Sequence, residues 1–501
     1  MPLLQRLRLA LGAPVFFLLL LAGGGSSVAS QTASWVIVGA QVADGTGAPL
    51  RAVNVRVVGD TIREAGEFEP REGESVINAA GLVLAPGFID IHNHSAESLA
   101  TQPLAESQIS QGITTVVLGP DGNSPWPIGA FLERHRRSPP AVNLAVFVGH
   151  ATLRRVMGDG FRRAARAEEI AQMERLVEQA MREGAMGLST GLEYDVGLRS
   201  DTGEVIALAR VAARYGGIYM THIRDEADRA LEAMAEAIAI GEQAGIPVQI
   251  SHIKLGTVGV WNRAAEAVAL VEQARARGVD VTADAYPYDA WASTITVLVP
   301  SRRHTNRADV ERGLEDVGGA GNVTIVRYTP NPEYEFRTLE EIARQRNITP
   351  VDLYIEIVRA GGASVVCRSM VEADIRAFYT QPWVMVASDG GIGARHPRGA
   401  GTFSRVLGRY VREQGWLTLP EAVRKMTSLP AHRLGWKDRG RIAPGMKADL
   451  VLFDAAQVID RSTFSTPSTL SAGIERVWVN GLLVWTGTSP AGARPGKVLA
   501  R

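Results

Sequence analysis

The sequence is nearly devoid of cysteine and carries no excess of charge of either sign. Its 501 residues include a single cysteine, Cys367, so no disulfide can form within the chain, and stability has to come from core packing and bound metal. Lys plus Arg and Asp plus Glu both number 53, and there is no basic stripe with interleaved aromatic residues. These absences argue against a nucleic-acid-binding protein and against attachment to an anionic membrane surface.

Long apolar runs are also scarce, and the one near the start is short. Arg6 and Arg8 precede an apolar run over residues 9–22, and small residues follow in the stretch GGGSSVAS. A charged, then apolar, then small-residue order is typical of a secretory signal peptide, and the run is short for a membrane span. We predict a signal peptide over residues 1–30 and an exported protein, in the periplasm of a bacterium, with no membrane attachment after cleavage. An uncleaved N-terminal anchor is the alternative.

The rest of the chain divides into β-rich ends and an alternating middle. Short Val- and Ile-rich runs with glycine turns occupy residues 31–83 and return over residues 441–501, so the two ends are predicted to form one small β-sandwich. Between them, over residues 84–440, strand-like runs alternate with amphipathic helical patterns. The runs span residues 84–94, 114–119, 143–150, 185–191, 218–224, 247–254, 281–288 and 384–390. This pattern predicts an α/β fold, a (β/α)8 TIM-like barrel, with an inserted subdomain over about 289–383.

Polar side chains follow the predicted barrel strands with unusual regularity. Five of the nine histidines lie at strand ends: His92, His94, His150, His222 and His252. In a strand, residues i and i+2 share a face, so His92 and His94 point the same way, and barrel enzymes place their chemistry at such ends. Two histidines alone could be chance, but five on one rim are hard to assign to packing.

These residue types point to metal-assisted hydrolysis. Imidazoles together with carboxylates suit Zn²⁺ and leave a position open for water. Water on such a metal ionises near neutral pH, and Asp389, at the end of the eighth predicted strand, is a suitable acceptor for its proton. The residues therefore predict a zinc-type hydrolytic centre at the mouth of the barrel.

Nine ordered motifs then carry a resemblance to a known family. They read APGFIDIHNH, GHATLRRVMG, GLSTGLEYDVG, THIRDE, ISHIK, TADAYPY, ASDGG, HPRGAGTFSRVLGRYVRE and GRIAPGMKADLVLFD. Together, over about residues 34–485, they resemble the amidohydrolase superfamily and, within it, the D-aminoacylases, or N-acyl-D-amino-acid deacylases. The resemblance implies a zinc-dependent hydrolase that cleaves the amide bond of N-acyl-D-amino acids to a carboxylate and a free D-amino acid.

Other functions stay open beside this one. A dipeptidase or amidase acting on peptides that contain D-residues would use the same centre, so the expected partner is a small N-acyl amino acid or a dipeptide. A ring-amide hydrolase is disfavoured because the lysine typical of those enzymes is missing after the fourth predicted strand. A metal-stabilised binding protein without activity is disfavoured by the intact Asp389, Lys254 and four histidines.

The resemblance also implies roles for individual residues. His92 and His94 would hold the more buried metal, which Asp389 also approaches, and His222 and His252 the more exposed one. Asp389 would shuttle the proton. The substrate-binding residues would be Tyr194 and Lys254, which hold the α-carboxylate, with Arg398 and His150.

One departure from the family pattern concerns the metal bridge. Many D-aminoacylases carry a cysteine ligand in a GNCG turn after the second strand, and here residues 119–122 read GPDG. Glu193 stands after the fourth predicted strand, where the cysteine type usually has an apolar residue. We hypothesise that Glu193 bridges the metals, with Asp121 as the competing bridge, and we expect one or two zinc ions per chain, with two favoured.

Overall fold

The structure is a computed structural model that describes residues 34–158, 160 and 163–500. The predicted signal peptide, residues 1–30, lies outside this described part. Within it, every helix is too short or too polar to pass through a bilayer.

Eight parallel strands form the barrel predicted from the sequence. They are β8 (Phe88–Asp90), β9 (Ile113–Leu118), β10 (Asn143–Val146) with its continuation β11 (Val148–Gly149), β12 (Gly187–Gly191), β13 (Ile218–His222), β14 (Val248–Ile250), β15 (Val281–Ala285) and β20 (Val384–Val386). The hydrogen-bonded orders are β10-β9-β8 and β11-β12-β13-β14-β15-β20. A parallel bridge between Asn93 and Gly390 joins the first strand to the last and closes the barrel. The predicted fold class is confirmed.

Amphipathic helices cover the outside of these strands. The main ones are α3 (Ile128–Arg137), α5 (Ala167–Glu183), α6 (Thr202–Arg214), α7 (Ala230–Ala244), α8 (Ala264–Ala276), α12 (Glu372–Tyr379) and α14 (Leu419–Met426). In α5 the buried residues Met173, Val177 and Ala180 recur at helical spacing and form one inward stripe. The strands, buried on both faces, are rich in Val, Ile, Ala and Gly, as a parallel sheet requires. The result is a rigid frame whose strand ends meet at one rim.

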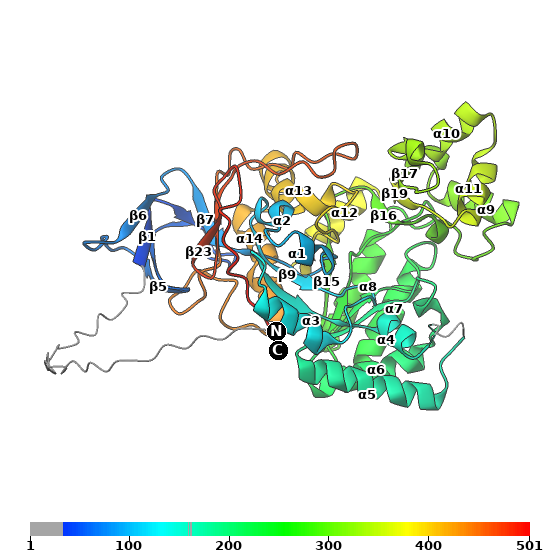
Figure 1. The fold of residues 1–501 in the computed structure, drawn as a ribbon, viewed down its shortest axis with the longest axis horizontal. Helices are drawn as coiled ribbons and strands as arrows, with labels where there is room; N and C mark the ends of the chain where they lie inside the picture. Colours follow the sequence, from blue (N-terminus) through cyan, green and yellow to red (C-terminus); the bar gives the residue numbers. More distant parts are fainter. Residues whose placement is uncertain (1–33, 159, 161–162, 501) are drawn as a thin grey trace, which may run out of the picture.

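Both ends of the chain contribute to the sandwich beside the barrel (Figure 1). One sheet has the order β5-β4-β1-β6 and the other β23-β22-β21-β7-β2-β3. Their bounds are β1 (Ser34–Val38), β2 (Gln41–Val42), β3 (Arg51–Ala52), β4 (Asn54–Val58), β5 (Thr61–Gly66), β6 (Ser75–Asn78), β7 (Val83–Pro86), β21 (Leu450–Phe453), β22 (Ile474–Val479) and β23 (Leu482–Trp485). The antiparallel pairing of β7 with β21 joins the two ends of the sequence.

The boundaries of the sandwich differ slightly from the predicted ones. Strand β7 belongs to the sandwich, so its first part extends to residue 86 instead of 83. The end of the chain returns to the barrel, where the amide of Leu144 donates to Lys497 and the amide of Leu499 donates to Leu144. These two hydrogen bonds attach the last residues to β10.

The insert is narrower than predicted and has its own core. It consists of β16 (Trp291–Thr294), β17 (Val323–Arg327), β18 (Arg337–Thr338) and β19 (Ser364–Cys367), with α9 (Arg307–Asp316), α10 (Leu339–Arg346) and α11 (Pro350–Arg359). Its hydrophobic cluster, which includes Leu314, Ile325 and Leu353, is separate from that of the barrel. Residues after β19 rejoin the barrel, because α12 packs on α8. Figure 1 shows the insert at the upper right, on the side away from the sandwich.

A buried lysine stands under the barrel where β20 begins. Lys425, on α14, has no exposed side-chain surface, and its Nζ donates to the carbonyl of Val384 at 2.9 Å and to that of Gln381. Burial lowers the pKa of this ammonium group from 10.5 to about 7, because the charged form loses its hydration.

We expect Lys425→Met to remove a pH dependence of the free energy of unfolding. The unfolded chain keeps the lysine proton up to pH 10.5, whereas the folded chain releases it above about 7. Between these values the unfolded state binds more protons, so wild-type stability falls as the pH falls, by up to about 1.4 kcal/mol per pH unit. Guanidinium unfolding of both proteins across this pH range measures the difference.

The exposed Lys437 provides the matched control, since Lys437→Met removes a lysine without changing a buried charge. An identical pH slope in wild type and Lys425→Met would contradict the prediction.

Candidate metal centre

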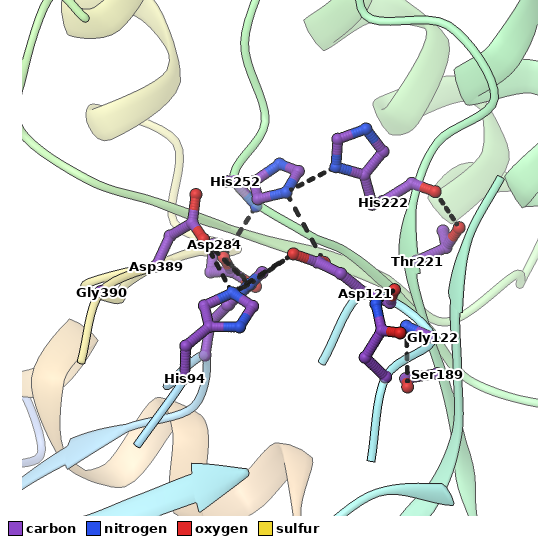
Figure 2. Close-up of polar contacts among 12 residues, drawn as sticks. His94, Asp121, Gly122, Ser189, Thr221, His222, His252, Asp284, Asp389 and Gly390 are labelled. Carbon is purple, nitrogen blue, oxygen red and sulfur yellow. Dashed lines mark hydrogen bonds and ion pairs between the residues drawn. The ribbon is translucent and has the colours of Figure 1, made fainter. Parts of the chain in front are cut away.

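The ends of the barrel strands bring the predicted histidines and acids to one place (Figure 2). His92 and His94 follow β8, His222 is the last residue of β13, His252 follows β14 and Asp389 follows β20. Asp121 joins them from the turn after β9. Five of these six residues are at least 94% buried, and His94 is the more exposed one.

Three of the converging residues have strained backbones. The φ angles of Asp121, His252 and Asp389 are 53°, 34° and 46°, in the left-handed region that residues other than glycine adopt uncommonly. The strain is held by neighbours, because the amide of Asp389 donates to the carbonyl of His92 at 3.0 Å and the amide of His252 donates to Oδ1 of Asp284 at 2.8 Å. The turn at Asp121 also needs Gly191, where a Cβ would lie 2.5 Å from the Asp121 carbonyl oxygen.

One group of donors has the spacing of a tetrahedral zinc site. Nε2 of His92 lies 3.3 Å from Nε2 of His94 and 3.2 Å from Oδ2 of Asp121. Oδ1 of Asp389 lies 3.3 Å from Nε2 of His92 and 3.1 Å from Nε2 of His94. The His94 Nε2 atom is also 3.4 Å from Oδ2 of Asp121. Four donors each about 2.0–2.1 Å from one Zn²⁺ lie roughly 3.3 Å apart. The donor set and its spacing therefore fit zinc.

A second group shares one member with the first. Nδ1 of His222 lies 3.0 Å from Nε2 of His252, which lies 3.6 Å from Oδ1 of Asp121. That oxygen is buried and has no hydrogen-bond partner among the described residues. Asp121 thus turns Oδ2 to the first group and Oδ1 to the second, and it is the carboxylate that lies between them.

Both central carboxylates are kept ionised by their surroundings. Burial alone would raise the pKa of Asp121, but His92 and His252 hold it well below its usual value. Burial likewise opposes ionisation of Asp389, and the charges of Arg398 and His252 outweigh it. Nη1 of Arg398 lies 2.7 Å from Oδ2 of Asp389. The site therefore presents two negative charges among its imidazoles, which is the environment a divalent cation needs.

Glu193 does not lie where the bridging hypothesis placed it. Its Oε2 is 2.8 Å from Nε2 of His222, the ring nitrogen opposite to the one that faces His252. It groups with His222 and Glu226 instead of lying between the two donor groups, and Asp121 occupies that position. The physical reason is the turn after β12, which brings the carboxylate to the Nε2 side of the His222 ring.

The residues expected to bind substrate divide into two sets. Tyr194, Lys254 and Arg398 line a cavity of about 530 Å³ next to the donor groups, as do Glu193, Glu226 and Arg302. Nζ of Lys254 donates to Oε1 of Glu226 at 2.6 Å and lies 2.8 Å from Nδ1 of His252. The ring of Tyr286 lies beneath the Arg398 guanidinium, 4.7 Å from its centre.

His150 is placed differently from the prediction. It is completely buried and lines neither this cavity nor a second one of about 320 Å³ among the described residues. The chain turns into α4 (His150–Val156) at this residue, so the ring faces α6, with Nε2 2.8 Å from Oε1 of Glu204. The same carboxylate accepts from Arg154 at 2.5 and 2.6 Å. These contacts give His150 a place in a buried ionic cluster.

Two acids beside the histidines were not assigned to the site from the sequence. Asp284, within β15, accepts from Gln249 at 2.8 Å and lies 3.3 Å from Nδ1 of His92. Glu226 lies 3.0 Å from Nδ1 of His252. Their one signal in the sequence is position: Glu226 in THIRDE and Asp284 in TADAYPY each stand near the end of a predicted strand.

Comparison with known proteins agrees with this geometry. The model of the Amidohydrolase family matches residues 75–485, and the chain belongs to this family. Within it, the chain is 38% identical to D-aminoacylase of Alcaligenes xylosoxydans xylosoxydans, covering 94% of this chain and 98% of that one. It is also 38% identical to N-acyl-D-glutamate deacylase of the same organism, over 93% and 96%.

A solved structure gives the same likeness in three dimensions. N-acyl-D-glutamate deacylase of Bordetella bronchiseptica, in complex with zinc and a phosphonate mimic of the tetrahedral intermediate, superposes with a TM-score of 0.85. It is 35% identical, and the match covers 93% of this chain and 99% of that one. The resemblance inferred from the nine motifs is confirmed.

We expect Glu204→Gln to destabilise the fold without changing zinc content. The substitution removes the carboxylate that compensates the charge of Arg154 and contacts His150 in a fully buried cluster, which costs about 3 kcal/mol. Denaturant unfolding and metal analysis of the purified protein measure the two quantities.

Glu242→Gln, at an exposed position on α7, is the control of equal charge change. A normal free energy of unfolding combined with a raised KM would restore His150 and its neighbours to substrate binding.

Proposed function

We propose that this chain is a zinc-dependent hydrolase that cleaves the amide bond of N-acyl-D-amino acids, releasing a carboxylate and a free D-amino acid. The observation that carries this proposal is the pair of donor groups joined by Asp121 at the floor of a cavity of about 530 Å³. The likeness to two deacylases along nearly the whole chain supports the choice of substrate.

The four histidines and two aspartates would hold the metal. His92, His94, Asp121 and Asp389 would hold one ion, and Asp121, His222 and His252 would hold a second. When bound, zinc polarises the scissile carbonyl and lowers the pKa of a coordinated water towards neutrality. Asp121, in the turn where many D-aminoacylases carry cysteine, takes the bridging role in this proposal.

Asp389 is the proton carrier. It borders the cavity, and it is ionised because the charges of Arg398 and the histidines outweigh burial and hold its pKa well below the usual value. Oδ1 faces the histidines, while Oδ2 lies against Arg398 at 2.7 Å. The carboxylate takes the proton of the attacking water and passes it to the leaving amine, as general acid–base catalysis requires.

The substrate carboxylate is held by the cationic side of the cavity. Lys254 and Arg398 both lie over the ring of Tyr286, 5.9 and 4.7 Å from its centre. Burial and the neighbouring acids raise the pKa of Tyr194 well above its usual value, so its hydroxyl keeps its proton and can donate to the carboxylate. Fixing the carboxylate here and the amide at the metal leaves one orientation for the side chain, which enforces chirality.

Two further points of the proposal concern substrate range and location. A dipeptide containing a D-residue is a second candidate, because the cavity extends from the metal donors to Trp291 and Arg302 of the segment after β15. We also propose that the protein is exported to the bacterial periplasm, on the strength of the signal-peptide pattern over residues 1–30.

The activity is tested with a panel of N-acetyl amino acids. We expect release of free amine from D-isomers and not from L-isomers, loss of activity with a chelator, and recovery with zinc. Asp389→Asn should lower kcat by about 10²- to 10⁴-fold, because the amide cannot carry the proton.

Dipeptides with a D-residue are run in parallel, and a higher kcat/KM for them would make the dipeptidase the correct reading. Hydrolysis of neither class by the zinc-loaded protein, or full activity of Asp389→Asn, would refute the proposal.

We expect Asp121→Asn to lower the zinc content from two ions towards one. An amide offers a single good ligand oxygen and no charge, so it cannot bind both positions, while asparagine tolerates the left-handed backbone of this residue. Metal analysis after dialysis against limiting zinc gives the count.

Asp195→Asn, at a side chain that is 79% exposed, is the matched control. Two tightly bound ions in Asp121→Asn would exclude Asp121 as the bridge.

A further inference from the structure

Each imidazole at the centre has two nitrogens with opposite requirements. The nitrogen that binds a metal must present a lone pair, so the ring proton stays on the other nitrogen, which then needs an acceptor. A carboxylate in that place fixes the tautomer and the orientation of the ring and makes the imidazole a stronger ligand. The identity of the group behind each histidine therefore matters for metal affinity.

The two nitrogens of His222 face different surroundings. Nδ1 points into the centre, 3.0 Å from Nε2 of His252 and 3.2 Å from the hydroxyl oxygen of Tyr194, and Figure 2 shows the rings of His222 and His252 turned towards each other. Nε2 points outward and lies 2.8 Å from Oε2 of Glu193. The His222 side chain is 4% exposed and that of Glu193 is 14% exposed, so water competes little for this contact.

Glu193 and His222, together with Glu226, do not form an additional metal site. Glu193, His222 and Glu226 have donor atoms close enough to hold a cation, but that cation would need the lone pair of Nε2. With Nδ1 already committed to the centre, His222 would have to lose both ring protons. In addition, Oε2 of Glu226 is 3.7 Å from Nε2, and its other oxygen accepts from Lys254 at 2.6 Å.

We propose that Glu193 is a positioning residue for the metal centre. It accepts the Nε2 proton of His222 and so holds Nδ1 as the ligand nitrogen. This inference rests on the zinc-dependent function proposed above. Arg302 of the insert donates from Nη2 to the backbone carbonyl of Glu193, which fixes the loop that carries the carboxylate.

Comparison with the other histidines shows why Glu193 gives the sharpest test. Glu226 stands behind His252, but it also pairs with Lys254, so its removal would change two contacts. Asp284 stands behind His92 and also accepts from the backbone of His252. The side chain of Glu193 contacts His222 alone among the histidines described, so its replacement changes one hydrogen bond at the centre.

The test measures zinc affinity of the full-length protein without substrate. Zinc dissociation constants are obtained by competition with a chelator for wild type, Glu193→Gln and Glu193→Leu, with Asp195→Asn as control. Asp195 is a nearby carboxylate that is 79% exposed and lies 3.9 Å from Arg302. We expect Glu193→Leu to weaken one zinc site by about 10- to 100-fold, Glu193→Gln to weaken it less because its amide oxygen still accepts, and Asp195→Asn to leave it unchanged.

Two further readouts separate positioning from direct ligation. Saturating zinc should restore the wild-type number of ions in both Glu193 variants, and the absorption spectrum of the cobalt-substituted Glu193→Leu protein should shift as the ring reorients. Fewer ions at saturation would make Glu193 a ligand and overturn the proposal. An equal loss of zinc affinity in Glu193→Leu and Asp195→Asn would show that only the removal of a negative charge matters, and it would also overturn the proposal.

The outcome for wild type keeps this inference distinct from the proposed function. If wild type binds zinc and Glu193→Leu binds it equally well, the positioning role falls and the deacylase proposal stands. If wild type binds no zinc, both fall. Should Glu193→Leu not fold, the comparison of Glu193→Gln with wild type carries the same test.

Discussion

The carboxylate of Asp121 is the group on which the whole centre depends. It is buried, it is ionised, and its two oxygens face different sets of histidines. A buried charge of this kind is costly unless it is paired, and here the pairing is with imidazoles that are themselves turned inward. The strained turn at Asp121, the glycine at position 191 and the ends of β8, β13 and β14 all meet at this one group. In many members of the D-aminoacylase family that the sequence resembles, a cysteine stands in this turn. The exchange replaces a soft sulfur donor with a hard carboxylate that has two oxygen donors.

Much of this arrangement could be predicted from the sequence, because parallel strands end on a common rim. The spacing of His92 and His94 and the strand ends at His222, His252 and Asp389 were sufficient to predict one shared site. The loop conformations were not predictable. Alternation of residues along a strand predicts which face of the strand a side chain occupies. It does not predict the direction of a side chain in a turn where φ is positive, as at Asp121 with a φ of 53°. The exchange of positions between Asp121 and Glu193 follows from this, since each stands in a turn and only the backbone decides which one reaches the space between the two donor groups.

The limits on the fold prediction have a similar origin. Alternating apolar runs identified all eight barrel strands, because those strands are buried on both faces and the pattern is strong. Boundaries were less accurate where the chain passes directly from one domain to the next, as at β7 and β8, which are separated by a single residue. The return of Lys497 and Leu499 to the barrel depends on tertiary pairing that no local pattern reveals. His150 was misplaced for the same reason, since a strand end that turns at once into a helix directs its side chain away from the rim.

The insert contributes to the cavity wall, whereas the metal centre belongs to the barrel. Its hydrophobic core is its own, yet the stretch from Trp291 to Arg302 forms one wall of the cavity. Apart from Arg302, which holds the loop of Glu193, residues of that wall can be substituted to change which side chains fit while the packing of the barrel and the metal ligands stay the same. Related enzymes can therefore evolve a different substrate specificity through mutations in the insert, while the catalytic centre in the barrel stays unchanged.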